Sequence, residues 1–462
     1  MHKNINYPIL ETLKEAAKHD EAMNLWPDRD NAFHSFLSQG FPHKKHEKWR
    51  NTDLSEYLQK EYSYIPNSDP VSESDINSIF RCEIHNFETY LFTLHNGAYV
   101  YKQSPLTTLD NGVVVGSLRT AWEDRDELVK PYLNSLTENM LNGLVSLNSA
   151  LATAGLFIYV PDNVIVEKPV QLINMINTAE NPFLQAKNLI VLGKNAELTF
   201  VQCDDSVQDQ DSFMNVVSEF HIDEGAKLDH YKLQNKELSS VLVNTSFFSL
   251  RKDSKMKTNT ITLNGGKIRN ETIVNLDGEG AEADIMGLYL VDKQQHVDNQ
   301  VLVRHNSANC YSNELFKGIL DDEATAAFNG HILVQPGAQK TNAYQNNKNI
   351  LLTDNAKVTA KPFLEIYADD VKCSHGATVG QLDEDALFYL KQRGICDLNA
   401  KMLLMYAFAE EVIRNIDIPS LHDSTADMVN RRLKGELSAC NQCVLHCNDQ
   451  KPIEFDIDLS KL

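Results

Sequence analysis

The chain has 462 residues, of which 42% are hydrophobic and 23% are charged. It is long enough to bury a large core in two or three domains. Its 43 basic and 64 acidic residues give a formal net charge of −21. This surplus of negative charge disfavours contact with nucleic-acid phosphates and with anionic membrane surfaces. We therefore expect no nucleic-acid partner and no membrane partner.

The N-terminal sequence MHKNINYPILETLKEAAKHD lacks the basic and then apolar pattern of a signal peptide. No apolar run approaches the roughly 20 residues that span a bilayer. These features predict a cytoplasmic protein. The eight cysteines are scattered along the chain, and in the cytoplasm such cysteines are thiols or ligands rather than a disulfide framework.

Residues 1–150 predict an N-terminal domain of helical and mixed structure. The segments ILETLKEAAKHDEAMNLW and NAFHSFLSQG carry apolar residues three and four positions apart, which is typical of amphipathic helices. The segment YLFTLHNGAYVY predicts a strand pair with its turn at Asn96 and Gly97. The following segment SLRTAWEDRDELVKPYLNSL predicts helix.

Residues 151–382 predict a β-rich core. Short runs such as LFIYV, NVIVE, VQLINMI and NLIVLG are separated by turn residues. A turn residue followed by a small residue recurs, mostly at intervals of about 30 residues. Its copies include Asn195-Ala196, Gly225-Ala226, Gly280-Ala281 and Gly376-Ala377. The repeat favours a parallel β-helix, in which each coil stacks on its predecessor. Because the repeat is ragged, a β-sandwich stays open as the alternative.

Residues 383–462 predict a C-terminal helical domain with a Cys-rich tail. Asp383 can cap a helix that has Leu387 and Leu390 on its apolar side. Gly394 ends this helix. Two further helices are expected at about residues 398–416 and 424–437. We expect these helices to cover the open end of the β stack, where bare strand edges would invite aggregation.

Three sequence blocks resemble the SufB/SufD family of the Suf iron–sulfur cluster assembly system. They are GFPHKKHEKWRNTDL at residues 40–54, SLNSALATAGLFIYVPDNVIVEKPVQLI at residues 146–173, and AQKTNAYQNNKNILLTDNAKVTAKPFLEIYADDVKCSHGATVGQLDEDALFYLKQRGI at residues 338–395. The combination of CSHGAT with GQLDEDALFYL is similar to the SufD branch rather than to its paralogue SufB. The resemblance implies a right-handed parallel β-helix between helical N-terminal and C-terminal domains.

The resemblance also implies a function. It implies a scaffold subunit, not an enzyme, that pairs with SufB through the β-helices and binds the ATPase SufC through the C-terminal helices. It leaves open a homodimer when the chain is alone. The candidate residues for docking SufC are Asp383, Leu387, Leu390, Met402, Met405 and Phe408. Core packing nevertheless accounts for most of the run MLLMYAFA, which is too short to span a membrane.

The segment ADDVKCSHGAT places Cys373 and His375 two residues apart, on one side of a strand that turns at Gly376. From the residues alone, the pair is either a small thiol packed beside a hydrogen-bonded histidine or a pair of ligands. The resemblance implies that His375 faces SufB and helps to build a transient iron–sulfur cluster, for which imidazole and thiolate are suitable ligands. Whether Cys373 contributes or only packs stays open.

The tail contains a second group of candidate ligands, outside the family pattern. Cys440, Cys443, His446 and Cys447 fall within eight residues. Ligands at such spacing can converge on one tetrahedral Zn or Fe ion. A redox-active tail without a fixed metal is an equally good interpretation.

The chain contains neither a Walker A phosphate loop nor the glycine fingerprint of a dinucleotide-binding fold, so ATP hydrolysis is expected of a partner. The rival functional class is a β-helix polysaccharide-active enzyme, which would need paired carboxylates on one face of the stack. Acidic pairs exist at Asp321-Asp322 and Asp369-Asp370. Turns and solvated faces explain both pairs more simply.

Overall fold

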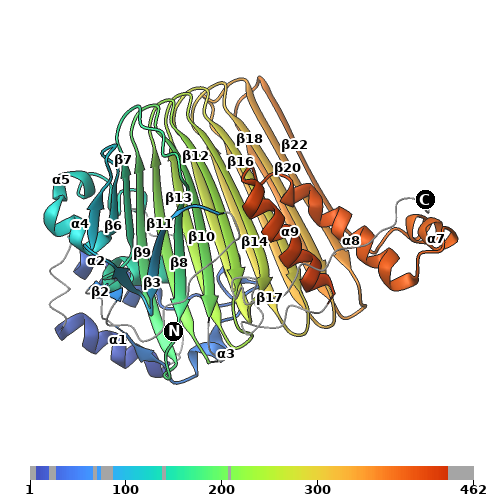
Figure 1. The fold of residues 1–462 in the computed structure, drawn as a ribbon, viewed down its shortest axis with the longest axis horizontal. Helices are drawn as coiled ribbons and strands as arrows, with labels where there is room; N and C mark the ends of the chain where they lie inside the picture. Colours follow the sequence, from blue (N-terminus) through green and yellow to red (C-terminus); the bar gives the residue numbers. More distant parts are fainter. Residues whose placement is uncertain are drawn as a thin grey trace.

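The computed structural model describes residues 7–19, 28–65, 70–73, 87–137, 142–206 and 210–434. Its centre is a parallel β-helix in which each turn contributes one strand to each of two stacked sheets (Figure 1). The predicted mainly β fold with a parallel β-helix core is therefore confirmed. The β-sandwich alternative is wrong, because neighbouring strands of the stack run parallel.

The long strands alternate between the two sheets. The odd sheet contains β7 (Leu156–Val160), β9 (Pro182–Leu192), β11 (Phe213–Ile222), β13 (Val241–Leu250), β15 (Lys267–Leu276), β17 (His296–His305), β19 (Thr325–Val334) and β21 (Lys357–Ile366). The even sheet contains β8 (Val170–Ile176), β10 (Glu197–Ser206), β12 (Lys227–Asn235), β14 (Lys255–Asn264), β16 (Glu282–Val291), β18 (Tyr311–Leu320), β20 (Thr341–Leu351) and β22 (Val371–Gly380). From β10 on, even strands begin 27 to 30 residues apart. This is the spacing that the repeat predicted.

The corners of the coils explain the repeated pair of a turn residue and a small residue. Asn195 has a φ of 55°, a left-handed conformation that Asn tolerates. The next residue, Ala196, is completely buried, because the corner packs against the adjacent coil. The predicted copy at Gly376 and Ala377 is wrong: β22 runs through both residues to Gly380, so the chain does not turn there.

The N-terminal region packs on the outer face of the odd sheet and extends both sheets at one end. Its helices are α1 (Pro8–His19), α2 (Arg29–Gln39), η2 (Glu47–Trp49), α3 (Ser55–Leu58), α4 (Leu118–Asp124), α5 (Asp126–Val129) and α6 (Gly143–Leu151). Its strands are β1 (Ser63–Tyr64), β2 (Val71–Ser72), β3 (Tyr90–His95), β4 (Ala98–Tyr101), β5 (Leu106–Thr108) and β6 (Val114–Ser117). The strand pair predicted around Asn96 and Gly97 is confirmed, because β3 and β4 are antiparallel there. Phe36, Trp49 and Leu147 share one apolar cluster with the odd-sheet residue Phe213.

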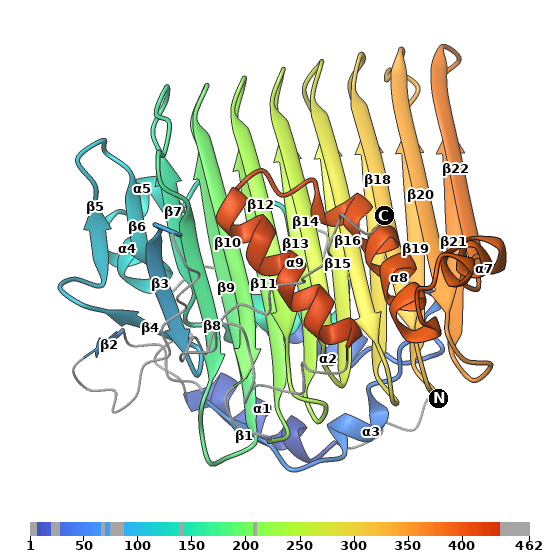
Figure 2. The ribbon, with the colours of Figure 1, turned by 45° about the vertical axis from the view of Figure 1, so that its right-hand side comes forward.

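The C-terminal helices are α7 (Glu384–Gln392), α8 (Asp397–Ile413) and α9 (Pro419–Leu433). The prediction that they cover the open end of the β stack is wrong. Figure 2 shows α8 and α9 lying across the face of the even sheet. There Val412 and Met428 join a buried cluster with the sheet residues Ile261 and Leu288. The outer face of this sheet offers much more apolar area to a helix than a single strand edge does, so burial favours it.

The last turn of the stack, β21 with β22, is uncovered in the part of the chain that the structure describes. Each of these strands ends its sheet, with a partner on one side only. Phe363, Tyr367 and Val379 are large apolar residues that stay exposed at this end.

The division of the chain into domains at residues 150 and 382 stays a prediction. None of the described helices has the length and apolar character needed to cross a bilayer.

Candidate functional site

The final strand of the even sheet presents Cys373 and His375 toward the inside of the β-helix. In the parallel pairing with β20, Ala343 lies opposite Cys373 and Gln345 lies opposite His375. Residues opposite each other on parallel strands point to the same face, and both Ala343 and Gln345 are buried. Cys373 and His375 therefore share the inner face of the last turn.

The two side chains differ in their surroundings. Cys373 is half-buried and packs against the apolar cluster of the last turns. Burial raises the pKa of its thiol above the ordinary value, only partly offset by a backbone hydrogen bond from Ala343. Thiolate formation is thus disfavoured unless a metal ion or a partner supplies positive charge. His375 is exposed, and its imidazole has no hydrogen-bond or ion-pair partner among the described residues.

A row of polar side chains leads inward from His375. Glu314 of β18 lies opposite Gln345 of β20, which lies opposite His375 of β22. The Nε2 of Gln345 donates a hydrogen bond of 2.7 Å to the Oε2 of Glu314. Glu314 is completely buried, and this burial raises the pKa of its carboxyl group to about 8. Its carboxyl group is therefore mostly protonated at neutral pH.

Glu314 and Gln345 were not among the residues predicted from the sequence. They lie far from His375 in the sequence and belong to no motif, so only the strand register brings the three side chains into one row. A second interior row contains Ser312, Ala343 and Cys373. The imidazole of His305 hydrogen bonds to the Oγ of Ser312 at 2.9 Å.

The predicted docking residues around α7 have mixed roles. The carboxylate of Asp383 accepts hydrogen bonds of 3.0 Å from the backbone N–H groups of Asp385 and Ala386, which makes it the N-cap of α7 as predicted. Leu387 and Leu390 are half-buried. None of the residues of α7 is fully buried, so this helix projects from the body of the molecule (Figure 1).

The predicted docking residues on α8 hold this helix on the even sheet. Met405 is buried, while Met402 and Phe408 pack half-buried against the same apolar cluster. The Nζ of Lys317 donates to the backbone oxygen of Phe408 at 2.9 Å and lies 4.2 Å from the centre of its ring. Lys317 also forms an ion pair with Glu411. These contacts anchor α8 to the sheet.

Other residues form the exposed apolar surface of these helices, and none of them was among the predicted docking residues. This surface, the α7–α8 patch, consists of Phe388, Tyr389, Leu398 and Leu403, which are between 43% and 68% exposed. Helical periodicity marks apolar residues in the sequence but does not tell which of two apolar stripes meets the sheet.

The tail residues Cys440, Cys443, His446 and Cys447 lie outside the described residues. Within residues that the structure describes, no group of three or more His, Cys, Asp and Glu side chains is arranged to hold a metal ion. A complete metal site built by the described part of this chain alone is therefore not present. Cys373 and His375 offer at most two ligands.

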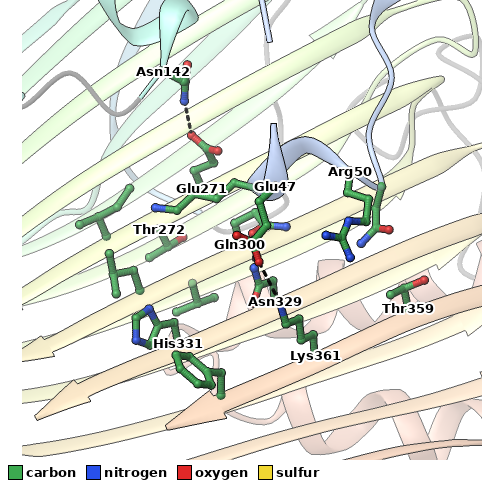
Figure 3. A pocket seen from close by; sticks show the side chains of 16 residues that line it. Glu47, Arg50, Asn142, Glu271, Thr272, Gln300, Asn329, His331, Thr359 and Lys361 are labelled. Carbon is green, nitrogen blue, oxygen red and sulfur yellow. Dashed lines mark hydrogen bonds and ion pairs between the residues drawn. The ribbon is translucent and has the colours of Figure 1, made fainter. Parts of the chain in front are cut away.

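A groove of about 510 Å³ lies between residues 47–51 and the outer face of the odd sheet (Figure 3). Its two carboxylates are both engaged. The side chain of Glu271 accepts hydrogen bonds from Asn142 and Arg269, each at 3.0 Å, and Glu47 lies 3.5 Å from the Nζ of Lys361. The groove therefore offers no free pair of carboxylates for general acid–base chemistry.

The acidic pair at Asp321 and Asp322 lies at a corner of the β-helix. The Oδ1 of Asp321 accepts the backbone N–H of Asp322 at 2.8 Å. The Oδ2 of Asp322 accepts the backbone N–H of Lys293 at 3.0 Å. Asp321 thus satisfies a backbone donor of its own corner and Asp322 one of the neighbouring coil, which is a structural use.

The two-sheet parallel β-helix, with helices on the outer faces of both sheets, defines the structural class of the protein. Residues 174–408 match the family model described as "SUF system FeS cluster assembly, SufBD core domain", and residues 8–172 match "SufBD protein N-terminal region". The chain belongs to the SufBD family of iron–sulfur cluster assembly proteins. The resemblance predicted from the three sequence blocks is thus confirmed.

Curated relatives cover most of the chain. An iron–sulfur cluster assembly SufBD family protein of Synechocystis is 29% identical over 92% of this chain and 95% of its own length. The iron–sulfur cluster assembly protein SufD of Escherichia coli is 28% identical over 88% of this chain and 93% of its own length. The iron–sulfur cluster assembly protein SufD of Bacillus subtilis is 29% identical over 70% of this chain and 75% of its own length. Family membership supports a role in the Suf system.

Proposed function

We propose that this chain is a scaffold subunit for iron–sulfur cluster assembly. It pairs with a SufB paralogue through the uncovered turn of β21 and β22, and it docks the ATPase SufC on the α7–α8 patch. At the paired interface His375 helps to hold or build a transient cluster, which is the cargo of the complex. The observation that carries the proposal is the uncovered last turn, with His375 exposed on its inner face.

The uncovered turn has the features of a pairing surface. Unpaired backbone N–H and C=O groups at the edge of a sheet are a template for a strand of another chain. Phe363, Tyr367 and Val379 add exposed apolar area at the same end, and contiguous apolar area of this kind marks interaction sites. A second β-helix stacked on β21 and β22 would pair the free backbone groups of the edge strands and bury the exposed apolar side chains.

The geometry also fits a ligand set shared between two chains. An iron–sulfur cluster in proteins is commonly held by four thiolate or imidazole ligands. Among the described residues, His375 and Cys373 supply two candidates at most, and the proposal assigns the others to the paralogue. The raised pKa of the Cys373 thiol favours a minor or late role for this residue, because it needs the positive charge of iron to lose its proton.

Docking of SufC is proposed for the α7–α8 patch rather than for the residues that anchor α8. The patch residues are exposed, whereas Met405 is used to attach the helix to the sheet. A partner that covers exposed apolar side chains such as Phe388 and Leu398 removes their apolar area from water, which favours binding.

The proposal has three further parts, two of which, the metal at the tail and the cytoplasmic location, rest on the sequence alone. Cys440, Cys443, His446 and Cys447 bind Zn or Fe in an accessory role. The chain forms a homodimer when SufB is absent, because a second copy offers the same uncovered edge. The whole assembly works in the cytoplasm.

The test is co-expression of the chain with the SufB and SufC homologues of its own organism, followed by the mass of the intact assembly. The proposal predicts one stable complex that contains all three subunits. Recovery of the chain without either partner, under conditions in which SufB and SufC are folded, would contradict it. Cleavage of an acidic polysaccharide by the purified chain would instead favour the rival enzyme, for which no free carboxylate pair was found at the groove or at Asp321 and Asp322.

A further inference from the structure

The interior of the last three turns is polar directly behind His375. Its neighbours in the row are Gln345 and Glu314, and the side chains of both are buried. Interior positions of a β-helix are usually filled by apolar side chains, since a buried polar atom without a partner is costly. Two adjacent polar residues at such positions therefore need hydrogen-bond partners.

In the structure, the amide nitrogen of Gln345 faces Glu314. The Nε2 of Gln345 donates to the Oε2 of Glu314 at 2.7 Å. The same Nε2 lies only 2.0 Å from where a Cβ at Gly330 would sit, so Gly330 leaves the room that this orientation needs. The Oε1 of Gln345 then has no hydrogen-bond partner among the described residues, although it is buried.

The next side chain along the row is that of His375. Strands in a sheet lie about 4.8 Å apart, so the Cβ atoms of opposed residues on one face are close neighbours. The imidazole of His375 can donate an N–H, whereas the Oε1 of Gln345 can only accept. The two groups complement each other, and the structure gives neither of them a hydrogen-bond partner among the described residues, so the contact requires the exposed imidazole to turn toward Gln345.

We propose that Gln345 is a positioning residue for His375, with its side-chain oxygen accepting one imidazole N–H while Glu314 holds the amide in the orientation that this requires. This contact selects one tautomer of the neutral imidazole. The other ring nitrogen then carries the lone pair and faces out of the open turn, toward whatever binds there. A histidine ligand is commonly oriented by such a hydrogen bond on its second nitrogen.

This inference deepens the proposed function, since a fixed tautomer is useful for a ligand nitrogen, but it concerns the free chain. Its test therefore needs neither SufB nor a cluster. Nitrogen-15 NMR of the full chain with labelled histidine reports the tautomer of each neutral imidazole, and a His375→Gln sample identifies the signals of this residue. The spectra are recorded at about pH 8.5, where an ordinary imidazole is neutral.

Gln345→Leu should change the tautomer ratio of His375 by about fivefold, the equilibrium effect of one net hydrogen bond of ordinary strength. Glu314→Leu should have a similar effect, because it frees the amide to rotate. Glu314→Gln keeps an acceptor at that position and should preserve the wild-type ratio. Asn347→Leu is the matched control: it is the next buried inward-facing residue of β20, and it lies opposite Ala377 rather than His375.

An unchanged ratio in Gln345→Leu and Glu314→Leu would overturn the inference, and so would an equal change in Asn347→Leu. If Gln345→Leu does not fold, the comparison of Glu314→Leu with Glu314→Gln decides. Failure of the proposed function is a separate result: a His375→Ala complex that builds clusters normally would refute the role of His375 but would leave its tautomer ratio as measured.

Discussion

The guanidinium of Arg269 lies 3.8 Å above the indole ring of Trp49. This contact joins the N-terminal region to the outer face of the odd sheet. Arg269 is buried and also forms ion pairs with Glu271 and Asp298. The ion pairs hold the guanidinium in the plane that stacks on the indole, so the buried charges and the packing of Trp49 depend on one another.

The first prediction follows from this cluster. Arg269→Met removes the cation and leaves two carboxylates without their buried partner, which should lower the free energy of unfolding by about 3–5 kcal/mol. Arg304→Met is the control on the same face, because Arg304 is only half-buried and donates to the amide oxygen of Asn275. Arg304→Met should lower the free energy of unfolding by only about 1 kcal/mol. Chemical denaturation measures the free energy of unfolding of both variants. Equal losses would show that the ion pairs of Arg269 stabilise the fold no more than the hydrogen bond of Arg304 does.

Glu314 gives a prediction about pH. Its pKa in the folded protein is about 8, above the roughly 4.3 of an exposed glutamate. The folded state therefore binds a proton that the unfolded state has lost, and stability falls as pH rises between these values. Below this window both states are protonated, so the titration of Glu314 adds no pH dependence to stability.

Glu314→Gln mimics the protonated side chain and removes this titration. Relative to the variant, the wild-type protein should lose up to about 1.4 kcal/mol per pH unit between about pH 4.5 and pH 8. Urea denaturation of both proteins at several pH values measures the slope. Parallel stability curves for the two proteins would mean that Glu314 is ionised in the folded state.

The α7–α8 patch predicts which substitutions separate docking from folding. Phe388→Ser and Leu398→Ser should each weaken binding of SufC at least tenfold, a loss of about 1.4 kcal/mol or more. Both side chains are more than 60% exposed, so the melting temperature should stay within a few degrees of wild type. Ile165→Ser is a matched control, since Ile165 is 58% exposed and lies at the other end of the β stack. Titration calorimetry measures the affinity of all three variants for purified SufC. Wild-type affinity in both patch variants would exclude the α7–α8 patch as the docking site.

The tail predicts a difference in metal content. The double variant Cys443→Ser, Cys447→Ser should contain about one equivalent less Zn or Fe than the wild-type chain, because a tetrahedral site that loses two of four ligands does not hold its ion. Cys396→Ser is the control, since Cys396 is an exposed free thiol in the described part of the chain. The double variant should still assemble with SufB and SufC. Elemental analysis that finds equal metal in all three proteins would refute the ligand interpretation.

The sequence predicted the repeating part of the fold because each coil needs the same corner. The pair Asn195-Ala196 shows why: a left-handed turn residue and a buried small residue leave a visible pattern. The final position of the C-terminal helices could not be predicted in this way. An amphipathic pattern says that a helix buries one face, but not whether it buries that face on the side or on the end of the stack.

The candidate site was predicted in part for a similar reason. Cys373 and His375 are close in sequence, so their shared face follows from strand periodicity. Glu314 and Gln345 join them only through the register of three strands, which depends on the length of every corner between residues 314 and 375. No local sequence pattern specifies the register of these three strands.

The central claim is that His375 serves cluster assembly and not the fold. The most direct test is anaerobic cluster reconstitution on the His375→Ala complex with SufB and SufC, with Lys372→Ala as the control on the same exposed strand. The account predicts that His375→Ala assembles and melts within a few degrees of wild type, because it removes an exposed imidazole. Its rate of cluster formation should fall at least tenfold, while Lys372→Ala and the companion variant Cys373→Ser show whether the loss is specific to the imidazole. Cluster formation at the wild-type rate in a correctly assembled His375→Ala complex would contradict the account.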